Sequence, residues 1–159
     1  MIRTTLCAAL VAVFPHAGFA QSLHVARTQV RECFAAAPTD ASYPDCLGQA
    51  ANKCQDLPGG STTIGIAQCV GAETDVWDAI LNEEYGRTRQ LFLKNGGEDL
   101  TRSLRDAQRA WIAFRDAECA LRYQRLVDGS IRTIAHASCL LQMTASRAVV
   151  LREMAEENQ

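Results

Sequence analysis

The sequence predicts an all-α protein, an antiparallel bundle of three long helices that follows a short, disulfide-stapled helical hairpin. Two observations lead to this fold class. Clusters of turn-forming residues divide the chain near positions 38–40, 44, 58–61, 95–97 and 128–130. Between these breaks the apolar residues recur at helical spacing, and no segment sustains the alternation typical of a strand.

Three long segments carry the helical pattern. The first runs over residues 62–95, with Thr62 or Thr63 as its cap and Asn95-Gly96 as its stop. Its apolar positions are Val70, Trp77, Leu81, Tyr85 and Phe92. The second runs from about 99 to 127, with one face formed by Leu100, Leu104, Ala107, Trp111, Phe114 and Leu121. The third runs from 130 to about 156, with Ile134, Leu141, Ala145, Ala148 and Met154. Short turns between them favour antiparallel neighbours.

The chain before the first long helix divides into two parts. Residues 1–20 are typical of a signal peptide, because Arg3 precedes the apolar run 6–14 and Gly18-Phe19-Ala20 forms a cleavage site before Gln21. Residues 21–61 form a cysteine-rich segment, with two shorter helices around Pro38. Residues 62–159 form the main helical domain. The apolar run of the leader is too short to span a membrane, and we expect no later segment to span one. These features predict a periplasmic or secreted protein.

Export decides how the cysteines are interpreted. Cys7 leaves with the signal peptide, and the remaining even number predicts disulfides in an oxidising compartment. Residues equally distant from the turn of a helical hairpin lie opposite each other. This geometry predicts the pairs Cys33–Cys46, Cys54–Cys69 and Cys119–Cys139.

Composition and motifs argue against several functions. Without the leader the chain keeps 15 basic and 18 acidic residues, a net charge of −3, which gives no basic surface for nucleic acid. His24 and His136 are the histidines left for acid–base chemistry, and the disulfide at Cys139 removes the thiolate that His136 would need for a metal site. Carboxylate pairs at 75/78, 83/84 and 153/156 are typical of solvated helix faces. We therefore predict no enzyme, no catalytic residue, no metal and no cofactor.

One set of polar residues repeats a helical spacing on all three long helices. Its members are Asp78, Asn82, Tyr85, Gln108, Trp111, Arg115, Glu118, Thr144 and Arg147. The structural interpretation is an interhelical polar layer that fixes helix register, with Arg115 paired to Asp78 or Glu118. The functional interpretation is a recognition surface. We favour the structural one, because buried polar groups normally satisfy each other.

These residues also carry a resemblance to a known family. The motifs are Cys69-x8-Trp77-Asp78-x2-Leu81-Asn82-x2-Tyr85, the run from Ala107 to Cys119, and Cys139 followed by Thr144, Arg147 and Leu151. Over residues 62–155 they resemble the LprI-type lysozyme-inhibitor N-terminal domain family. The resemblance implies an exported protein related to a lipoprotein that inhibits lysozyme. This chain lacks the lipobox cysteine of that lipoprotein.

The functional expectation follows from this resemblance. We expect a lysozyme inhibitor that acts by protein–protein binding, with Glu98 and Asp99 in the most acidic turn as the element that enters the enzyme. The alternative is a structural or adaptor module of the cell envelope, with residues 21–55 as its docking element. A glycan-cleaving enzyme is the third and weakest hypothesis.

Overall fold

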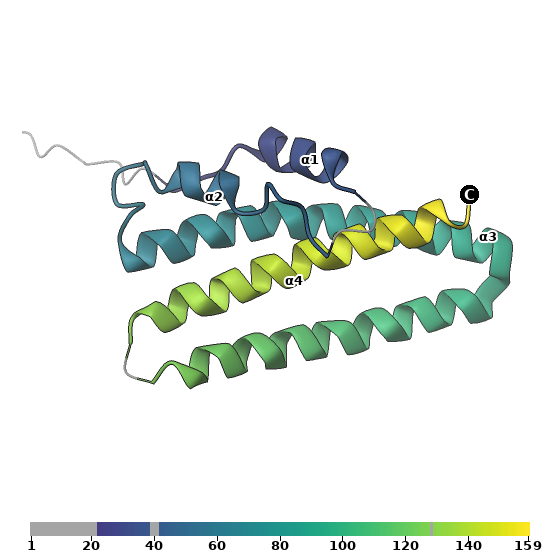
Figure 1. Cartoon of the computed structure of the whole chain (residues 1–159). Helices are drawn as coiled ribbons and strands as arrows, with labels where there is room; N and C mark the ends of the chain where they lie inside the picture. Colours follow the sequence, from purple (N-terminus) through teal and green to yellow (C-terminus); the bar gives the residue numbers. More distant parts are fainter. Residues whose placement is uncertain (1–21, 39–41, 128) are drawn as a thin grey trace, which may run out of the picture.

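The structure is a computed structural model that describes residues 22–38, 42–127 and 129–159. Those residues form four α-helices and no strand, which confirms the all-α fold class (Figure 1). The helices are α1 (Arg27–Ala36), α2 (Gln49–Cys54), α3 (Thr63–Arg125) and α4 (Ile131–Glu156). The predicted signal peptide, residues 1–20, lies outside the described residues.

Helix α3 combines the first two predicted long helices. Gly97 is the residue inside it with non-helical backbone angles, φ 70° and ψ −163°, and the chain reverses direction there. This leaves a first arm, residues 63–96, and a second arm, residues 98–125, which run antiparallel (Figure 1). Thr62 caps the first arm as predicted, because its hydroxyl accepts a hydrogen bond of 2.9 Å from the amide of Gly65.

The core lies where α4 packs against both arms of α3 (Figure 1). Ala145, Ala148 and Leu151 of α4 are completely buried, as is Trp77 of the first arm. Alanine has no side chain beyond Cβ, so these positions let the helices approach closely and interdigitate with the larger residues. Apart from the half-buried Tyr85, the predicted apolar face of residues 62–95 is buried.

The predicted face of the second arm is partly wrong. Leu104 is buried and Trp111 is half-buried, but Leu100, Phe114 and Leu121 are 37%, 60% and 51% exposed. Ala107 is exposed as well. The arm lies at the edge of the bundle, so one side of it contacts the other helices. The two sets of apolar residues form neighbouring rows on the same helix, roughly a sixth of a turn apart.

Three disulfides staple the bundle, and they are the three pairs that hairpin geometry predicts. Cys33–Cys46 ties α1 to the segment before α2, and Cys54–Cys69 ties α2 to α3. Cys119–Cys139 joins the second arm to α4. Their Cα–Cα distances are 5.8, 5.6 and 5.5 Å, within the range of ordinary disulfides.

Two buried charged residues connect the N-terminal segment to the long helices. The carboxylate of Glu73 accepts hydrogen bonds from the amides of Gly48 (2.8 Å) and Ala51 (2.7 Å) at the start of α2. Arg152 of α4 donates to the carbonyls of Phe34 (2.6 Å) and Ala37 (2.5 Å) at the end of α1. These contacts satisfy backbone groups that a helix leaves open at its ends. Helices α1 and α2 therefore share the core of the main helices.

Helix α4 corrects one expectation about hydropathy. We expected no segment after the leader to be long and apolar enough to span a membrane, yet α4 reaches a mean hydropathy of 1.2 over an 18-residue window. In the structure its completely buried residues pack against α3, and it carries the half-buried Arg147 and the buried Arg152. An interior helix of a folded protein has the same composition.

Candidate functional site

The two arms of α3 enclose a hollow of about 280 Å³ on one side of the bundle. Six of the nine predicted polar-layer residues line it: Asp78, Asn82, Tyr85, Gln108, Trp111 and Arg115. The remaining lining residues are Leu81, Arg105, Arg109 and Ile112. The structure thus gathers the polar residues of two predicted helices at one surface, which we call the arm hollow.

One link of the predicted polar layer crosses from α4 to the second arm. Arg147 Nε donates a hydrogen bond of 2.8 Å to Gln108 Oε1, and its guanidinium lies 5.8 Å from the centre of the Trp111 ring. The guanidinium of Arg115 lies 5.2 Å from the same ring. Burial lowers the pKa of Arg147 below its ordinary value. Contacts with the indole and the amide compensate part of the cost of burying that charge.

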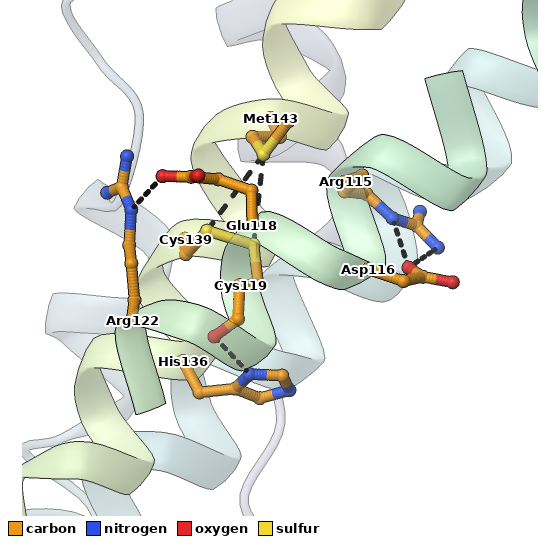
Figure 2. Close-up of a disulfide and its surroundings, with 8 residues drawn as sticks. All are labelled: Arg115, Asp116, Glu118, Cys119, Arg122, His136, Cys139 and Met143. Atoms are coloured by element: carbon orange, nitrogen blue, oxygen red, sulfur yellow. Dashed lines mark hydrogen bonds and ion pairs between the residues drawn. A yellow bond between two sulfur atoms is a disulfide. The ribbon is translucent and has the colours of Figure 1, made fainter. Parts of the chain in front are cut away.

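The expected ion pairs of Arg115 are wrong. Arg115 pairs with Asp116 at 2.9 Å rather than with Asp78 or Glu118, and Glu118 instead accepts from Arg122 at 3.2 Å (Figure 2). Asp78 lines the same hollow from the first arm, but Asp116 is the next residue along the chain from Arg115 and takes its guanidinium. The carboxylate of Asp78 accepts a 2.9 Å hydrogen bond from Asn82, one turn away.

The remaining member of the layer lies deep in the core. Thr144 is completely buried, and its hydroxyl has no hydrogen-bond partner among the described residues. Seven of the nine residues therefore contribute to the cross-helix link or to the solvent-accessible hollow, Glu118 and Thr144 belong to neither, and the set does not close into a single buried network.

The chemistry of the arm hollow suits recognition better than catalysis. The lining includes three arginines, Arg105, Arg109 and Arg115, and a single carboxylate, that of Asp78. Aromatic and aliphatic side chains form the rest of the lining. Guanidinium groups bind carboxylates in a planar, two-point geometry, so the hollow can accept an acidic side chain that carries an apolar portion. Glycan cleavage needs two carboxylates that flank the glycosidic bond, and this hollow is lined by one carboxylate, that of Asp78.

The predicted binding turn lies at the end of the molecule where the two arms meet (Figure 1). Glu98 and Asp99 are exposed, and the Asp99 side chain is 91% accessible while it pairs with Arg102 at 2.9 Å. Asn95 donates a hydrogen bond of 2.6 Å to the carbonyl of Asn158 near the C-terminus. The turn is therefore an exposed, acidic tip that the end of α4 supports.

Several of the other carboxylates and histidines considered from the sequence have structural contacts. Glu83 pairs with Arg31, Glu84 with Arg87, and Glu156 lies 4.0 Å from Arg152. His136 Nδ1 lies 3.0 Å from the carbonyl oxygen of Cys119, beside the disulfide (Figure 2). In the described part of the chain, no group of three or more His, Cys, Asp or Glu residues is placed to hold a metal ion.

Sequence reasoning missed the charged residues that organise the N-terminal segment and the rim of the hollow. Glu73 and Arg152 contact residues far away in the sequence, so no local pattern marks them. The sequence indicates Arg105 and Arg109 as site residues only weakly. They lie one helical turn apart, close to Gln108 and Trp111 of the predicted polar layer.

The model of the family described as "Lysozyme inhibitor LprI" matches residues 54–151, well over half of the chain. The chain belongs to the LprI family. The match confirms the resemblance seen in the motifs, and it also includes Cys54, which lies before the residues that carried the resemblance. The LprI family is described as one of inhibitors rather than of enzymes. The match covers both arms of α3 and therefore the arm hollow.

Comparison with curated proteins gives a shorter match. This LprI-family chain is 37% identical over 54 residues to an uncharacterised protein of Rhizobium meliloti (strain 1021). The matched stretch covers 34% of this chain and 39% of that relative. No solved structure matches the chain.

Proposed function

We propose that this chain is an exported inhibitor of lysozyme that acts by binding the enzyme. The observation that carries the proposal is membership of the LprI family over residues 54–151. Three disulfides support an oxidising location outside the cytoplasm, where a lysozyme would be met.

The acidic tip at Glu98 and Asp99 is the element we propose to enter the enzyme. Enzyme clefts are concave, and this tip is exposed at the end of the bundle, between two helical arms. A rigid tip loses little conformational entropy on binding. Many lysozymes are basic proteins, so the acidic tip would also speed encounter. The basic arm hollow supplies a second contact for acidic side chains of the enzyme.

A lysozyme assay tests the proposal. Oxidised protein is titrated against hen-type and goose-type lysozymes on labelled cell walls. We expect dose-dependent inhibition that disappears when the disulfides are reduced. No inhibition of either class at about 10 μM protein, a concentration well above the Kd of typical inhibitors, would reject the proposal.

The variant Glu98→Ser/Asp99→Ser tests the tip. We expect it to lower inhibitory potency by about three- to tenfold at low ionic strength, with a smaller effect in salt. Glu32→Ser/Asp56→Ser is the matched control, because it removes the same charge from exposed positions away from both the tip and the arm hollow. Equal loss in both variants would show that net charge, and not the tip, is responsible.

The alternative is a non-enzymatic adaptor of the cell envelope. Residues 21–55 were its expected docking element, but Val30, Ala50 and Cys54 are buried in the same core as Trp77. Deleting this segment would expose that core, so the deletion does not separate the two hypotheses. Substitution of the exposed Tyr43 by Asp is a cleaner test. Loss of an endogenous partner with unchanged lysozyme inhibition would favour the adaptor.

A further inference from the structure

An apolar strip on the outer side of the second arm is left largely exposed to solvent. Its larger members recur every seven residues at Leu100, Phe114 and Leu121, with Ala107 in the remaining place. Leu100, Phe114 and Leu121 are 37%, 60% and 51% exposed. Soluble proteins rarely leave such a continuous apolar row facing water.

A second row lies beside the first and completes a heptad pattern. Ser103, Ala110 and Ala117 each follow a member of the first row by three residues, and all of them are exposed. Alternating steps of three and four residues are what a helix presents to another helix that packs along its whole length. From Leu100 to Leu121 the strip is about 32 Å long at 1.5 Å per residue. The pattern therefore identifies the occupant as a helix.

We propose that this strip is an interface with a second copy of the same chain, packed antiparallel along the second arm. In the antiparallel register, members of one row face members of the other. Phe114 then faces Ala110 of the second copy, Leu121 faces Ser103, and Ala107 faces Ala117. Each large side chain meets a small one, so one strip supplies the complement of the other.

A parallel pair of strips would fit poorly. Phe114 would face Phe114 and Leu121 would face Leu121, whereas Ala107 and Ala110 would each face another alanine. Wide and narrow layers would alternate, and the narrow ones would leave voids. A two-fold antiparallel pairing avoids this and forms a closed dimer.

The borders of the strip also tolerate self-contact. On one border, Ala113 faces Ala113 of the second copy, and Asp106 faces Ala120 of the second copy. The other border turns toward the protein's own bundle, because Leu104 is buried there and Trp111 and Glu118 are half-buried. No carboxylate meets a carboxylate across the two-fold axis. Small residues at the border allow the helix axes to approach to about 8 Å.

The size of the strip sets the expected affinity. About three heptads of one helix lie at the lower end of the area that specific dimers bury. A weak, reversible dimer is therefore expected, with a Kd in the range of tens to hundreds of micromolar. The strip begins beside the acidic tip at Leu100, but Phe114 lies 15 residues beyond Asp99 on the same arm, about 22 Å at 1.5 Å per residue. Substitutions at Phe114 therefore test self-association without changing the tip.

Sedimentation equilibrium of the oxidised chain up to about 200 μM tests the proposal in a range suited to weak interfaces. The wild type should show a monomer–dimer equilibrium, and Phe114→Asp should raise the dimer Kd at least about tenfold. Ile112→Asp is the matched control, because Ile112 is also exposed (40%) on the same helix but lies outside the strip. It should leave the Kd unchanged.

Two double variants test the register. Ala107→Glu/Ala117→Lys places opposite charges against each other only in the antiparallel register, so dimerisation should persist. Ala107→Glu/Ala117→Glu places like charges together, and dimerisation should be lost. Loss in both would overturn the antiparallel register.

Three results would overturn self-association through the strip. One is a wild type that remains monomeric at about 200 μM, above the expected Kd range of a weak dimer. Another is a dimer that Phe114→Asp leaves unchanged, since the contact would then lie elsewhere. The third is a monomer whose Phe114→Asp variant loses lysozyme inhibition, because the strip would then belong to the enzyme interface. Far-ultraviolet circular dichroism of each variant confirms that the exposed substitutions keep the fold.

Discussion

At the residue scale, Glu73 is a charged residue that the fold buries almost completely. Its carboxylate accepts from two backbone amides of the α2 region and, at 3.2 Å, from the indole of Trp77. Glu73→Ala would leave these donors buried without an acceptor, and we expect a loss of about 3–5 kcal/mol in the free energy of unfolding. Glu73→Gln keeps one acceptor oxygen and should cost less. Urea unfolding with the disulfides intact measures both. The exposed neighbour Asp75→Ala should change stability by less than about 0.5 kcal/mol, and an equal loss there would contradict this role for Glu73.

A second residue-scale prediction concerns pH. Arg31 donates to both carboxylate oxygens of Glu83 at 2.9 and 2.6 Å, and these hydrogen bonds hold the pKa of Glu83 below its ordinary value of 4.5. A carboxyl with a lowered pKa in the folded state stabilises it above the unfolded pKa, and this contribution is lost as the pH falls through the folded pKa. The melting temperature of the wild type should thus exceed that of Glu83→Gln at neutral pH by a small margin, because the pair is exposed. The margin should disappear in acid below the ordinary value. A margin that stays constant to low pH would contradict this role for the pair.

At the scale of elements, Gly97 decides how α3 is built. Its φ of 70° lies where side chains are strained, and the two arms reverse direction there. Gly97→Ala should therefore destabilise the protein by about 1–2 kcal/mol. Gly86→Ala is the matched control, because Gly86 lies within the first arm and an added Cβ meets open space. It should stabilise the helix by about 0.5–1 kcal/mol. Thermal unfolding compares the two, and destabilisation by both would show that the backbone angle of Gly97 is not the cause.

The elements also show how far sequence reasoning reaches. The disulfide pairs were predictable because each pair of cysteines flanks one turn, and a hairpin fixes which residues lie opposite. The buried side of the second arm was not predictable, because Leu104 and Leu100 each begin a row of apolar residues at helical spacing. Choosing between them requires the position of α4. The arm hollow was predictable only as a set of polar residues on three helices. Its opening to solvent depends on which side of the first arm faces the core.

At the scale of the whole molecule, the second arm is the part with least buried surface. Among residues 98–125, the buried ones are Leu104, Gln108 and Cys119. The Cys119–Cys139 disulfide therefore holds the far end of this arm against α4, with the sulfur of Met143 within 3.9 Å of both cysteine sulfurs (Figure 2). Little other buried area resists local opening there.

Removing this staple should loosen one part of the molecule and leave the rest intact. In Cys119→Ala/Cys139→Ala we expect the amides of residues 110–125 to lose protection from hydrogen exchange by about 2–4 kcal/mol, as a disulfide of this loop length contributes. The amides around Trp77 should keep theirs, because two other disulfides and the contacts of Glu73 and Arg152 hold that half. Hydrogen exchange by mass spectrometry distinguishes the two regions. A uniform loss of protection would instead mean that the bundle unfolds as one unit and that the second arm has no independent weakness.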